Sequence, residues 1–221
     1  MPHVVAIDGP AGAGKSTIAR ALAAKLGYVY IDTGAMYRAV ALWAVRERIN
    51  PDDTHKVENL ALAADIGLTQ TGAVLLNRED VSEAIRAPGV ASAASRIAAI
   101  GAVRAALVAK QRDMADRANV VMEGRDIGTV VFPNARVKVF LDADPAERVR
   151  RRAADQPGVP PERLASEIAQ RDQRDRHRAE SPLVQAPDAV YLDSTGLTAD
   201  EVVERILKLV RERISNGKEH S

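Results

Sequence analysis

A glycine-rich turn near the start of the sequence constrains the fold of this chain more than any other feature. It reads Gly9-Pro10-Ala11-Gly12-Ala13-Gly14-Lys15-Ser16-Thr17. The apolar run Val4–Ile7 before it is typical of a buried strand, and the apolar residues of Lys15–Leu26 after it fall on one helical face. A strand, this turn and a helix in that order fit the phosphate-loop pattern of Gly, any four residues, Gly, Lys and Ser or Thr.

The chemistry of this loop indicates a bound triphosphate. Glycines let successive backbone N–H groups turn toward an anion, and the helix that begins near Lys15 adds the positive end of its dipole. Lys15 can neutralise the β- and γ-phosphates, and the Ser16 hydroxyl can face Mg²⁺. We assign nucleotide binding to the whole run Gly9–Thr17. A chance match is the alternative, which the flanking strand and helix disfavour.

Strands and helices alternate along much of the chain. Predicted strands cover Val4–Ile7, Tyr28–Ile31, Val120–Met122, Val137–Leu141 and Val190–Leu192. A second helix is predicted over Ala35–Arg48, and the last helix begins at a capping box of Thr198 and Glu201. The pattern predicts an α/β fold with a doubly wound, five-stranded parallel sheet of the P-loop NTPase type, within one domain spanning 1–221.

Two stretches interrupt the alternation. Residues 61–103 contain an extended piece, Ala73–Asn77, then a charged turn, Arg78-Glu79-Asp80, and an alanine-rich helix, so they predict an inserted subdomain. Residues 148–178 hold nine arginines and no lysine, and the Pro- and Gly-containing segment 156–161 breaks them. That composition predicts a mobile lid lined with arginine.

The overall composition argues against several classes of partner. Lys plus Arg number 31 against 30 Asp plus Glu, and aromatic residues make up 3%, so we expect no nucleic-acid partner. The apolar run Ala39–Val45 is too short to span a bilayer, the N-terminus has no secretory pattern, and cysteine is absent. We expect a cytoplasmic protein with no membrane partner, acting as a monomer.

A second site is predicted at the strand ends, where open α/β sheets bind ligands. Glu123 follows a predicted strand and can orient Mg²⁺-bound water, and Arg125 and Asp126 come directly after it. For Arg125 and Asp126 alone, a surface ion pair is the simpler interpretation.

A third cluster lies in the predicted lid. Arg171, Arg174, Asp175 and Arg178 have the spacing of one helical face. A solvated surface is the usual explanation of such a charge run. Arginine used in preference to lysine instead favours bidentate recognition of phosphate oxygens.

The turn after the second predicted strand opens onto the same sheet edge. It carries Thr33, Tyr37 and Arg38, and Arg38 can reach a phosphate there. One triphosphate cradle beside a separate arginine cluster indicates two phosphorylated ligands and hence phosphoryl transfer between nucleotides.

These motifs resemble those of the bacterial cytidylate kinases, a branch of the nucleoside monophosphate kinases. The resemblance extends over nearly the whole chain. Beyond the phosphate loop it is carried by Asp32–Arg38, Glu123–Pro133, Arg171–Arg178 and Leu192–Thr195. It implies transfer of the γ-phosphoryl group of ATP to CMP or dCMP with Mg²⁺ as cofactor. It also makes 61–103 a monophosphate-binding insertion and 148–178 a closing lid.

The resemblance also implies roles for single residues. The catalytic residues are Lys15, Arg125, Arg174 and Arg178. The metal contacts are Ser16 and Glu123, where some relatives have aspartate. The acceptor phosphate is assigned to Tyr37, Arg38, Arg125 and Arg178, the ribose to Arg171 and Asp175, and the cytosine to Ser95, Arg104 and Asp126. Thr33, often serine in relatives, keeps the hydroxyl and with it a substrate contact.

The assignment of Asp126 has an independent physical basis. Its carboxylate can accept a hydrogen bond from the cytosine amine but repels the carbonyl that uracil presents at that position. No general base is needed, because an acceptor phosphate is already ionised at neutral pH.

Other functions remain open from the residues alone. The same loop serves kinases of other nucleotides or small metabolites. A nucleotide switch without turnover is a further alternative, but the sequence lacks the Asn-Lys-x-Asp run that reads guanine.

Overall fold

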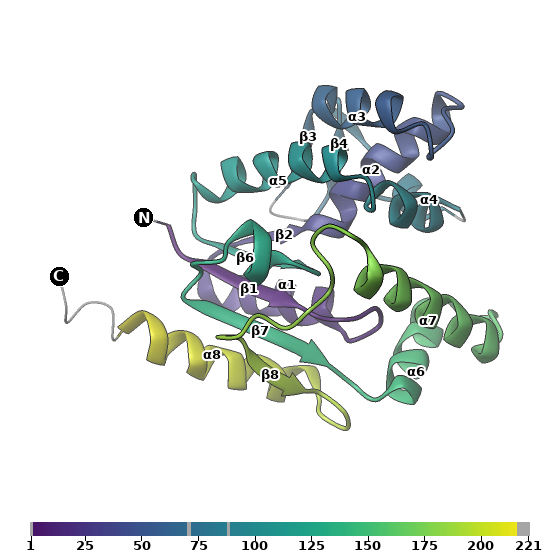
Figure 1. Ribbon diagram of the computed structural model, residues 1–221. Coiled ribbons are helices and arrows are strands. Elements are labelled where there is room, and N and C mark those ends of the chain that lie inside the picture. Colours follow the sequence, from purple (N-terminus) through teal and green to yellow (C-terminus); the bar gives the residue numbers. More distant parts are fainter. Residues whose placement is uncertain (1, 70–71, 88, 216–221) are drawn as a thin grey trace. The chain divides into compact units, whose positions relative to one another are not determined.

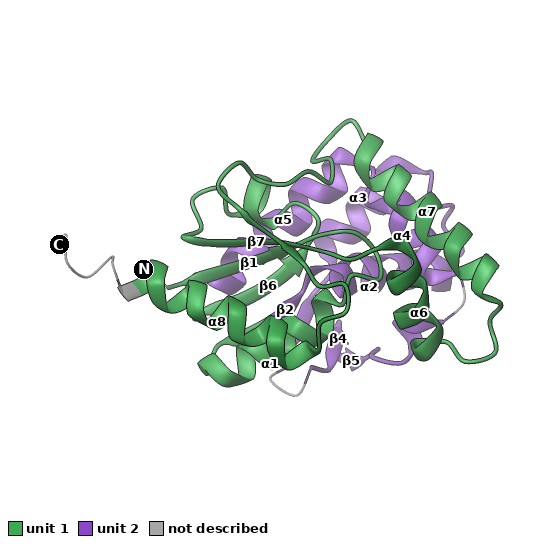
Figure 2. Cartoon of the chain, turned by 90° about the horizontal axis from the view of Figure 1, so that it is seen from below, with its two compact units in different colours: residues 1–30, 117–221 green, residues 31–116 purple. Residues whose placement is uncertain are grey.

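The computed structural model describes residues 2–69, 72–87 and 89–215. The chain divides into two compact units (Figure 2). The first comprises residues 1–30 and 117–221, and the second comprises residues 31–116. The predicted insertion, 61–103, falls within the second unit, and the predicted lid, 148–178, falls within the first.

A five-stranded sheet runs through the structure in the order β2-β6-β1-β7-β8 (Figure 1). These strands are Val29–Asp32, Val120–Gly124, Val4–Asp8, Val137–Asp142 and Val190–Asp193. Strand β1 pairs in parallel with β6 and β7, and β7 pairs in parallel with β8. The residues of β1 from Val5 onward are buried, as expected for a central strand covered on both faces. The predicted doubly wound parallel α/β sheet is confirmed.

Two long helices complete the core of the first unit. Helix α1 spans Lys15–Leu26, and helix α8 spans Ala199–Ser215. They contact each other, and their apolar side chains join those of β1 and β7 in one cluster. Its fully buried members include Val5, Ile7, Leu22, Val137, Leu141, Val203 and Ile206.

The capping box predicted for the last helix is also confirmed. The Glu201 side chain accepts from the Thr198 backbone N–H at 2.8 Å, and the Thr198 hydroxyl accepts from the Glu201 N–H at 3.3 Å.

Two further helices make up most of the predicted lid. Helix α6 spans Pro145–Asp155, and Asp144 caps it by accepting from the Ala146 N–H at 2.8 Å. Helix α7 spans Pro161–His177 and contacts α6. Both begin with proline, which suits the first helical position because its missing N–H has no helical partner there. The Pro- and Gly-containing segment between them ends α6 as the sequence predicts.

The second unit is mainly helical. Its helices are α2 Thr33–Arg46, α3 Thr54–Ala63, α4 Val90–Ile97 and α5 Gly101–Ala115, with a 3₁₀ turn at Ala84–Arg86. A small antiparallel sheet joins β3 Ile66–Leu68, β4 Val74–Leu76 and β5 Glu79–Asp80. The prediction of a turn over Arg78-Glu79-Asp80 is therefore wrong. Asn77 and Arg78 make the turn in the left-handed region, φ 50° and 72°, and Glu79–Asp80 is a strand that pairs with β4.

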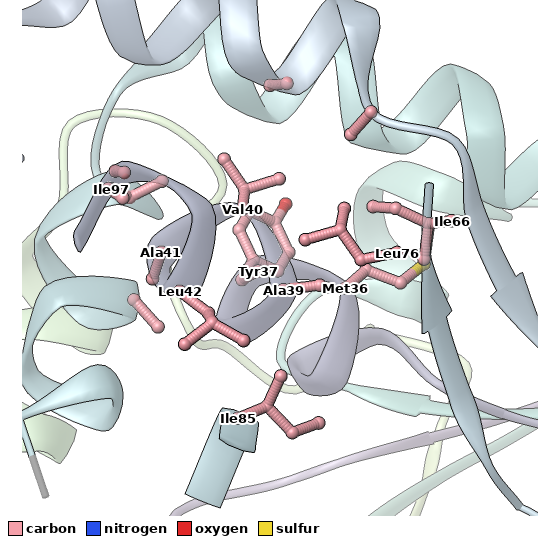
Figure 3. Close-up of a cluster of buried hydrophobic side chains, with 14 of the residues drawn as sticks. Met36, Tyr37, Ala39, Val40, Ala41, Leu42, Ile66, Leu76, Ile85 and Ile97 are labelled. Atoms are coloured by element: carbon pink, nitrogen blue, oxygen red, sulfur yellow. The ribbon is translucent and has the colours of Figure 1, made fainter. Parts of the chain in front are cut away.

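Helix α2 lies at the centre of the second unit's core (Figure 3). It contacts α3, α4 and α5, and its alanines at 39, 41 and 44 are fully buried. Small side chains let several helices approach one helix closely, which accounts for the alanines of the apolar run Ala39–Val45. Met36, Val40 and Leu107 add the larger buried side chains.

No single helix in the described ranges has both the length and the apolar character to cross a bilayer. Helices α4 and α5 meet those criteria only as a pair, and the chain bends by 98° between them.

We expect Leu107→Ala to lower the free energy of unfolding by about 2–5 kcal/mol, because Leu107 is fully buried and its removal leaves a cavity. Leu62→Ala is the matched control, since Leu62 is 58% exposed, and should change stability by less than about 0.5 kcal/mol. Denaturant titration of the three proteins measures both values. Equal effects of the two substitutions would contradict the assignment of this core.

Candidate active site

The phosphate loop joins β1 to α1, as the sequence predicts (Figure 1). Gly9 has φ 152°, and a Cβ atom there would lie 2.0 Å from the carbonyl oxygen of Leu141 in β7. Gly14 precedes α1 in the left-handed region, with φ 88°. Only glycine suits both positions. The first N–H groups of α1 have no carbonyl one turn earlier, so this helix end can bind an anion.

Lys15 is the first residue of α1 and is buried, with 6% of its surface exposed. Its Nζ donates to the carbonyl oxygen of Pro10 at 2.6 Å. Burial lowers the pKa of Lys15 to about 7, and the positive charge of Arg125 acts in the same direction. Lys15 is thus held within the loop in an environment that disfavours its charge, and an arriving phosphate would reverse that preference.

Asp8, to which the sequence analysis gave no role, fixes the turn that follows β6. Its two carboxylate oxygens accept from the N–H groups of Ile127 and Gly128 at 2.8 and 2.7 Å. Burial raises the pKa of Asp8 to about 6, although these two N–H groups oppose the rise. A buried carboxylate with two backbone donors holds the turn, a π-helical one over Ile127–Val131, against the end of β1.

Glu123 lies in β6 directly opposite Ile7 of β1, so it stands at the carboxyl end of the central strands. It is buried, and its carboxylate accepts a hydrogen bond from the hydroxyl of Tyr30. The Ser16 side chain is exposed at the start of α1. A carboxylate and a hydroxyl are the oxygen ligands that Mg²⁺ prefers.

Four charged side chains of the first unit form a buried cluster. Arg125 Nε donates to Asp175 Oδ2 at 2.9 Å, and Arg178 lies 3.5 Å from Asp126 Oδ1 and 4.0 Å from Asp175 Oδ1. Each of the four side chains is at most 14% exposed. The surface-pair interpretation of Arg125 and Asp126 therefore does not describe their surroundings.

The balance of charge in this cluster is visible at Asp175. Burial alone would raise the pKa of Asp175, but the positive charges of Arg125, Arg171 and Arg178 outweigh it and hold that pKa below its ordinary value. The carboxylate is therefore ionised at neutral pH. Three arginines thus act on one ionised carboxylate, and guanidinium groups in such a setting can bind an anion.

Helix α7 carries three of the four residues predicted to share one helical face, whereas Arg178 follows the last helical residue, His177, in an extended conformation. Asp175 is buried and Arg171 is half-buried, whereas Arg174 is exposed and its Nε donates to the Gln170 carbonyl oxygen of the same helix at 3.3 Å. The buried stripe of α7 passes through Ile168, Asp172 and Asp175. Arg174 lies about 100° around the helix axis from Asp175, at the margin of that stripe.

The second unit contains the other predicted substrate residues. Asp32 caps α2 by accepting from the Ala35 N–H at 2.9 Å, and Arg38 Nη2 donates to the same carboxylate at 2.8 Å. Thr33 and Tyr37 are buried in α2. Arg38 is thus held one turn into the helix by the residue that starts it.

Arg104 and Ser95 lie in α5 and α4 of the same unit. Arg104 is 3% exposed, donates to the Ala98 carbonyl oxygen at 3.2 Å, and its guanidinium lies 5.5 Å from the centre of the Tyr37 ring. The Ser95 hydroxyl is buried and makes no hydrogen bond within the described residues. A buried polar atom of this kind is costly unless a ligand or water satisfies it.

Arg151 of α6 makes a further contact that the sequence analysis missed. Its Nη1 donates to the Ala13 carbonyl oxygen at 3.1 Å and to the Ser194 hydroxyl at 2.9 Å. Its Nε donates to Glu147 at 2.8 Å. The motif Leu192–Thr195 is therefore linked to the phosphate loop through Arg151. The only sequence signal of this contact was the arginine-rich composition of α6.

The pKa of Lys15 predicts a pH-dependent gain in stability for Lys15→Met. Between about pH 7 and 10.5 the Lys15 side chain holds a proton in the unfolded chain but not in the folded protein, so the contribution of Lys15 to wild-type stability rises with pH in this window. The methionine variant lacks this dependence. Its advantage in free energy of unfolding should therefore be largest near pH 6 and shrink toward pH 10, by on the order of 4 kcal/mol.

Denaturant titrations at pH 6, 8 and 10 measure this difference. Lys208→Met, at an exposed position of α8, is the matched control and should differ from wild type equally at every pH. A difference between Lys15→Met and wild type that does not vary with pH would disprove the inferred pKa.

Comparisons with known proteins agree with this geometry. The family model described as Cytidylate kinase matches residues 5–212. A cytidylate kinase of Solibacter usitatus is 60% identical over 224 residues, which cover 99% of this chain and 96% of that protein. A cytidylate kinase of Desulforamulus reducens is 53% identical, over 93% of this chain and 96% of that protein.

A solved structure shows likeness of fold alone. The gluconokinase from Sinorhizobium meliloti 1021 superposes with a TM-score of 0.51 at 16% identity, covering 100% of this chain and 98% of that chain. The loop geometry, the sheet order and the match to the family model over residues 5–212 lead to one conclusion. The chain belongs to the cytidylate kinase family.

Proposed function

We propose that this protein transfers the γ-phosphoryl group of ATP to CMP or dCMP, giving ADP and CDP or dCDP. The observation that carries the proposal is the buried pair of Asp126 and Arg178, 3.5 Å apart. The charges of Asp126 and of Lys15 in the phosphate loop both act on Asp8. A buried carboxylate can accept from the cytosine amine, and a buried guanidinium can bind a phosphate oxygen. Both lie in the unit that carries the phosphate loop.

The proposed mechanism uses alignment and charge rather than proton abstraction. The acceptor phosphate is ionised at neutral pH, so no side chain has to act as a general base. Lys15 leaves the Pro10 carbonyl and follows the charge of the transferred group. Arg125 and Arg178 hold the acceptor phosphate, and Arg174 turns from its own helix toward the transferred phosphoryl group.

The remaining substrate contacts extend the same scheme. Arg171 and Asp175 bind the ribose. The contributions of the second unit come from Thr33, Tyr37, Arg38, Ser95 and Arg104. The buried hydroxyl of Ser95 supports a role at the base, because a ligand would satisfy it.

Mg²⁺ is proposed as the cofactor. It usually binds through one or two protein oxygen ligands together with nucleotide phosphates, and Ser16 and Glu123 supply that donor set. When bound it would neutralise charge on the β- and γ-phosphates. The backbone N–H groups of Gly9–Thr17 would hold the same phosphates.

We further propose that residues 61–103 bind the monophosphate and that 148–178 close over the substrates. The near-neutral charge and 3% aromatic content support small nucleotides, rather than nucleic acid or a membrane, as partners of a cytoplasmic monomer.

We expect Lys15→Ala to reduce kcat by at least about 100-fold, because a cation that stabilises developing charge is worth several kcal/mol. A coupled assay of ADP formation with saturating ATP, Mg²⁺ and CMP measures this. Near-normal turnover would remove Lys15 from the proposed mechanism.

We expect Asp126→Ala to lower kcat/KM for CMP strongly, leave the KM for ATP within about twofold, and narrow the CMP-to-UMP preference by about tenfold or more. Asp126→Asn is a second variant in case Asp126→Ala misfolds, because asparagine keeps the size and shape of the side chain beside Arg178 but removes its charge. Asp200→Ala, at an exposed position of α8, is the control. Acceptor profiling of each variant with CMP, dCMP, UMP, AMP and shikimate decides the outcome, and an unchanged CMP-to-UMP ratio would mean that another residue reads the base.

A further inference from the structure

Two charged residues from different helices form hydrogen bonds with the backbone of Ala11 in the phosphate loop. The Ala11 N–H donates to Asp172 Oδ1 of α7 at 2.8 Å, and Arg148 Nη1 of α6 donates to the Ala11 carbonyl oxygen at 3.0 Å. Arg148 and Asp172 also form an ion pair with each other. Arg148 is 8% exposed and Asp172 is 6% exposed.

These contacts restrict the backbone of the loop in a specific way. The N–H and the carbonyl of Ala11 belong to two successive peptide planes, so binding both fixes the backbone dihedrals of that residue. The peptide plane between Pro10 and Ala11 is held at both ends, because Lys15 Nζ donates to its oxygen. The orientation of these planes decides which N–H groups of the loop turn toward a phosphate.

Close packing also restricts the loop at Gly12, next to Ala11. A Cβ atom at Gly12 would lie 3.0 Å from the Arg148 carbonyl oxygen, so the loop runs directly against the backbone of α6. A buried ion pair is weak evidence for stability, because desolvation offsets most of its attraction. The placement of this pair on the loop backbone is better explained by a role in shaping the loop.

Asp172 also connects the loop to the acceptor residues. On α7 it lies next to Arg171 and one turn before Asp175, which bonds Arg125. Helix α7 therefore contacts the phosphate loop through Asp172, and it carries the proposed ribose contacts Arg171 and Asp175 beside that residue. Through the backbone of α7, the contact of Asp172 with the loop is thus connected to the contact of Asp175 with Arg125.

We propose that Arg148 and Asp172 are positioning residues that set the conformation of the phosphate loop and couple ATP binding to acceptor binding. The coupling part of this inference rests on the proposed function, whereas the effect on ATP binding does not. By linkage, ATP strengthens the binding of CMP by the same factor by which CMP strengthens the binding of ATP.

The test uses the full chain with Asp172→Asn, Arg148→Met and the double variant. Asp172→Asn is isosteric and keeps an oxygen for the Ala11 N–H but loses the charge opposite Arg148. Should Arg148→Met fail to fold, Arg148→Lys is a milder variant, because it keeps the positive charge at position 148 but loses the planar guanidinium group. Arg163→Met and Glu167→Gln are matched controls, since these residues form an exposed pair on α7 with N and O 3.0 Å apart.

Calorimetry measures the dissociation constant of ATP without acceptor, and that of CMP with and without a non-hydrolysable ATP analogue. We expect each single variant to weaken ATP binding by about fivefold or more. The ratio of the CMP dissociation constants without and with the ATP analogue should fall toward one. The double variant should lose less than the product of the single losses, because the two residues grip the same peptide groups. CMP binding without the analogue should stay within about twofold of wild type, and the controls should match wild type throughout.

Thermal unfolding of each variant separates positioning from stability. A purely structural pair predicts lower unfolding temperatures with wild-type ATP affinity in the folded protein, and that result would overturn the proposal. Failure of the wild type to bind or phosphorylate CMP would instead refute the proposed acceptor. The comparison of ATP dissociation constants would still decide the role of Arg148 and Asp172.

Discussion

Burial of charge at the carboxyl end of the central strands is the constraint on which the first unit depends. Asp8, Lys15, Glu123 and Asp126 are each about 5% exposed, in a region where an unpaired charge is strongly destabilising. Each of them therefore requires partners, which the surrounding elements supply. Backbone N–H groups serve Asp8, a loop carbonyl serves Lys15, and an arginine from the end of α7 serves Asp126. The positions of the turn after β6 and of helix α7 follow from these requirements.

The buried charges of this region lower the stability of the folded protein but prepare it to bind an anion. Burial lowers the pKa of Lys15 to about 7 and raises that of Asp8 to about 6, so both groups are held in environments that oppose their charges. Asp175 shows the opposite balance, because three arginines keep its carboxylate ionised despite burial. Such opposed shifts within one cluster are typical of functional sites rather than of a passive core.

The fold could be predicted well from the sequence because its signals are local. The alternation of apolar strands with amphipathic helices gave the five-stranded sheet, and the spacing of Gly9–Ser16 gave the loop between β1 and α1. The turn predicted over Arg78–Asp80 lies at Asn77–Arg78 instead, because Glu79 and Asp80 have polar side chains yet pair with β4 through their backbone. Backbone pairing of exposed charged residues leaves no trace in an apolar pattern.

The site was predicted less completely, because several of its residues act through contacts distant in sequence. Periodicity placed Arg174 on the face of Arg171 and Asp175, but the buried stripe of α7 includes Asp172 and Asp175 and leaves Arg174 at its margin. Nothing local indicates that Asp172 meets Ala11, since 161 positions separate them. Asp8 likewise reads as the polar end of a strand, and its partners are 119 and 120 positions away.

The contacts of Arg151 have a consequence for how the arginine-rich helices can travel. Through this residue α6 is fastened to the Ala13 carbonyl and to Ser194 at the end of β8. The proposed closure of residues 148–178 over a nucleotide would have to turn α6 about these contacts or break them. Contacts at the sheet edge, and not only the length of the connecting chain, would then limit how far the guanidinium groups of α7 can move.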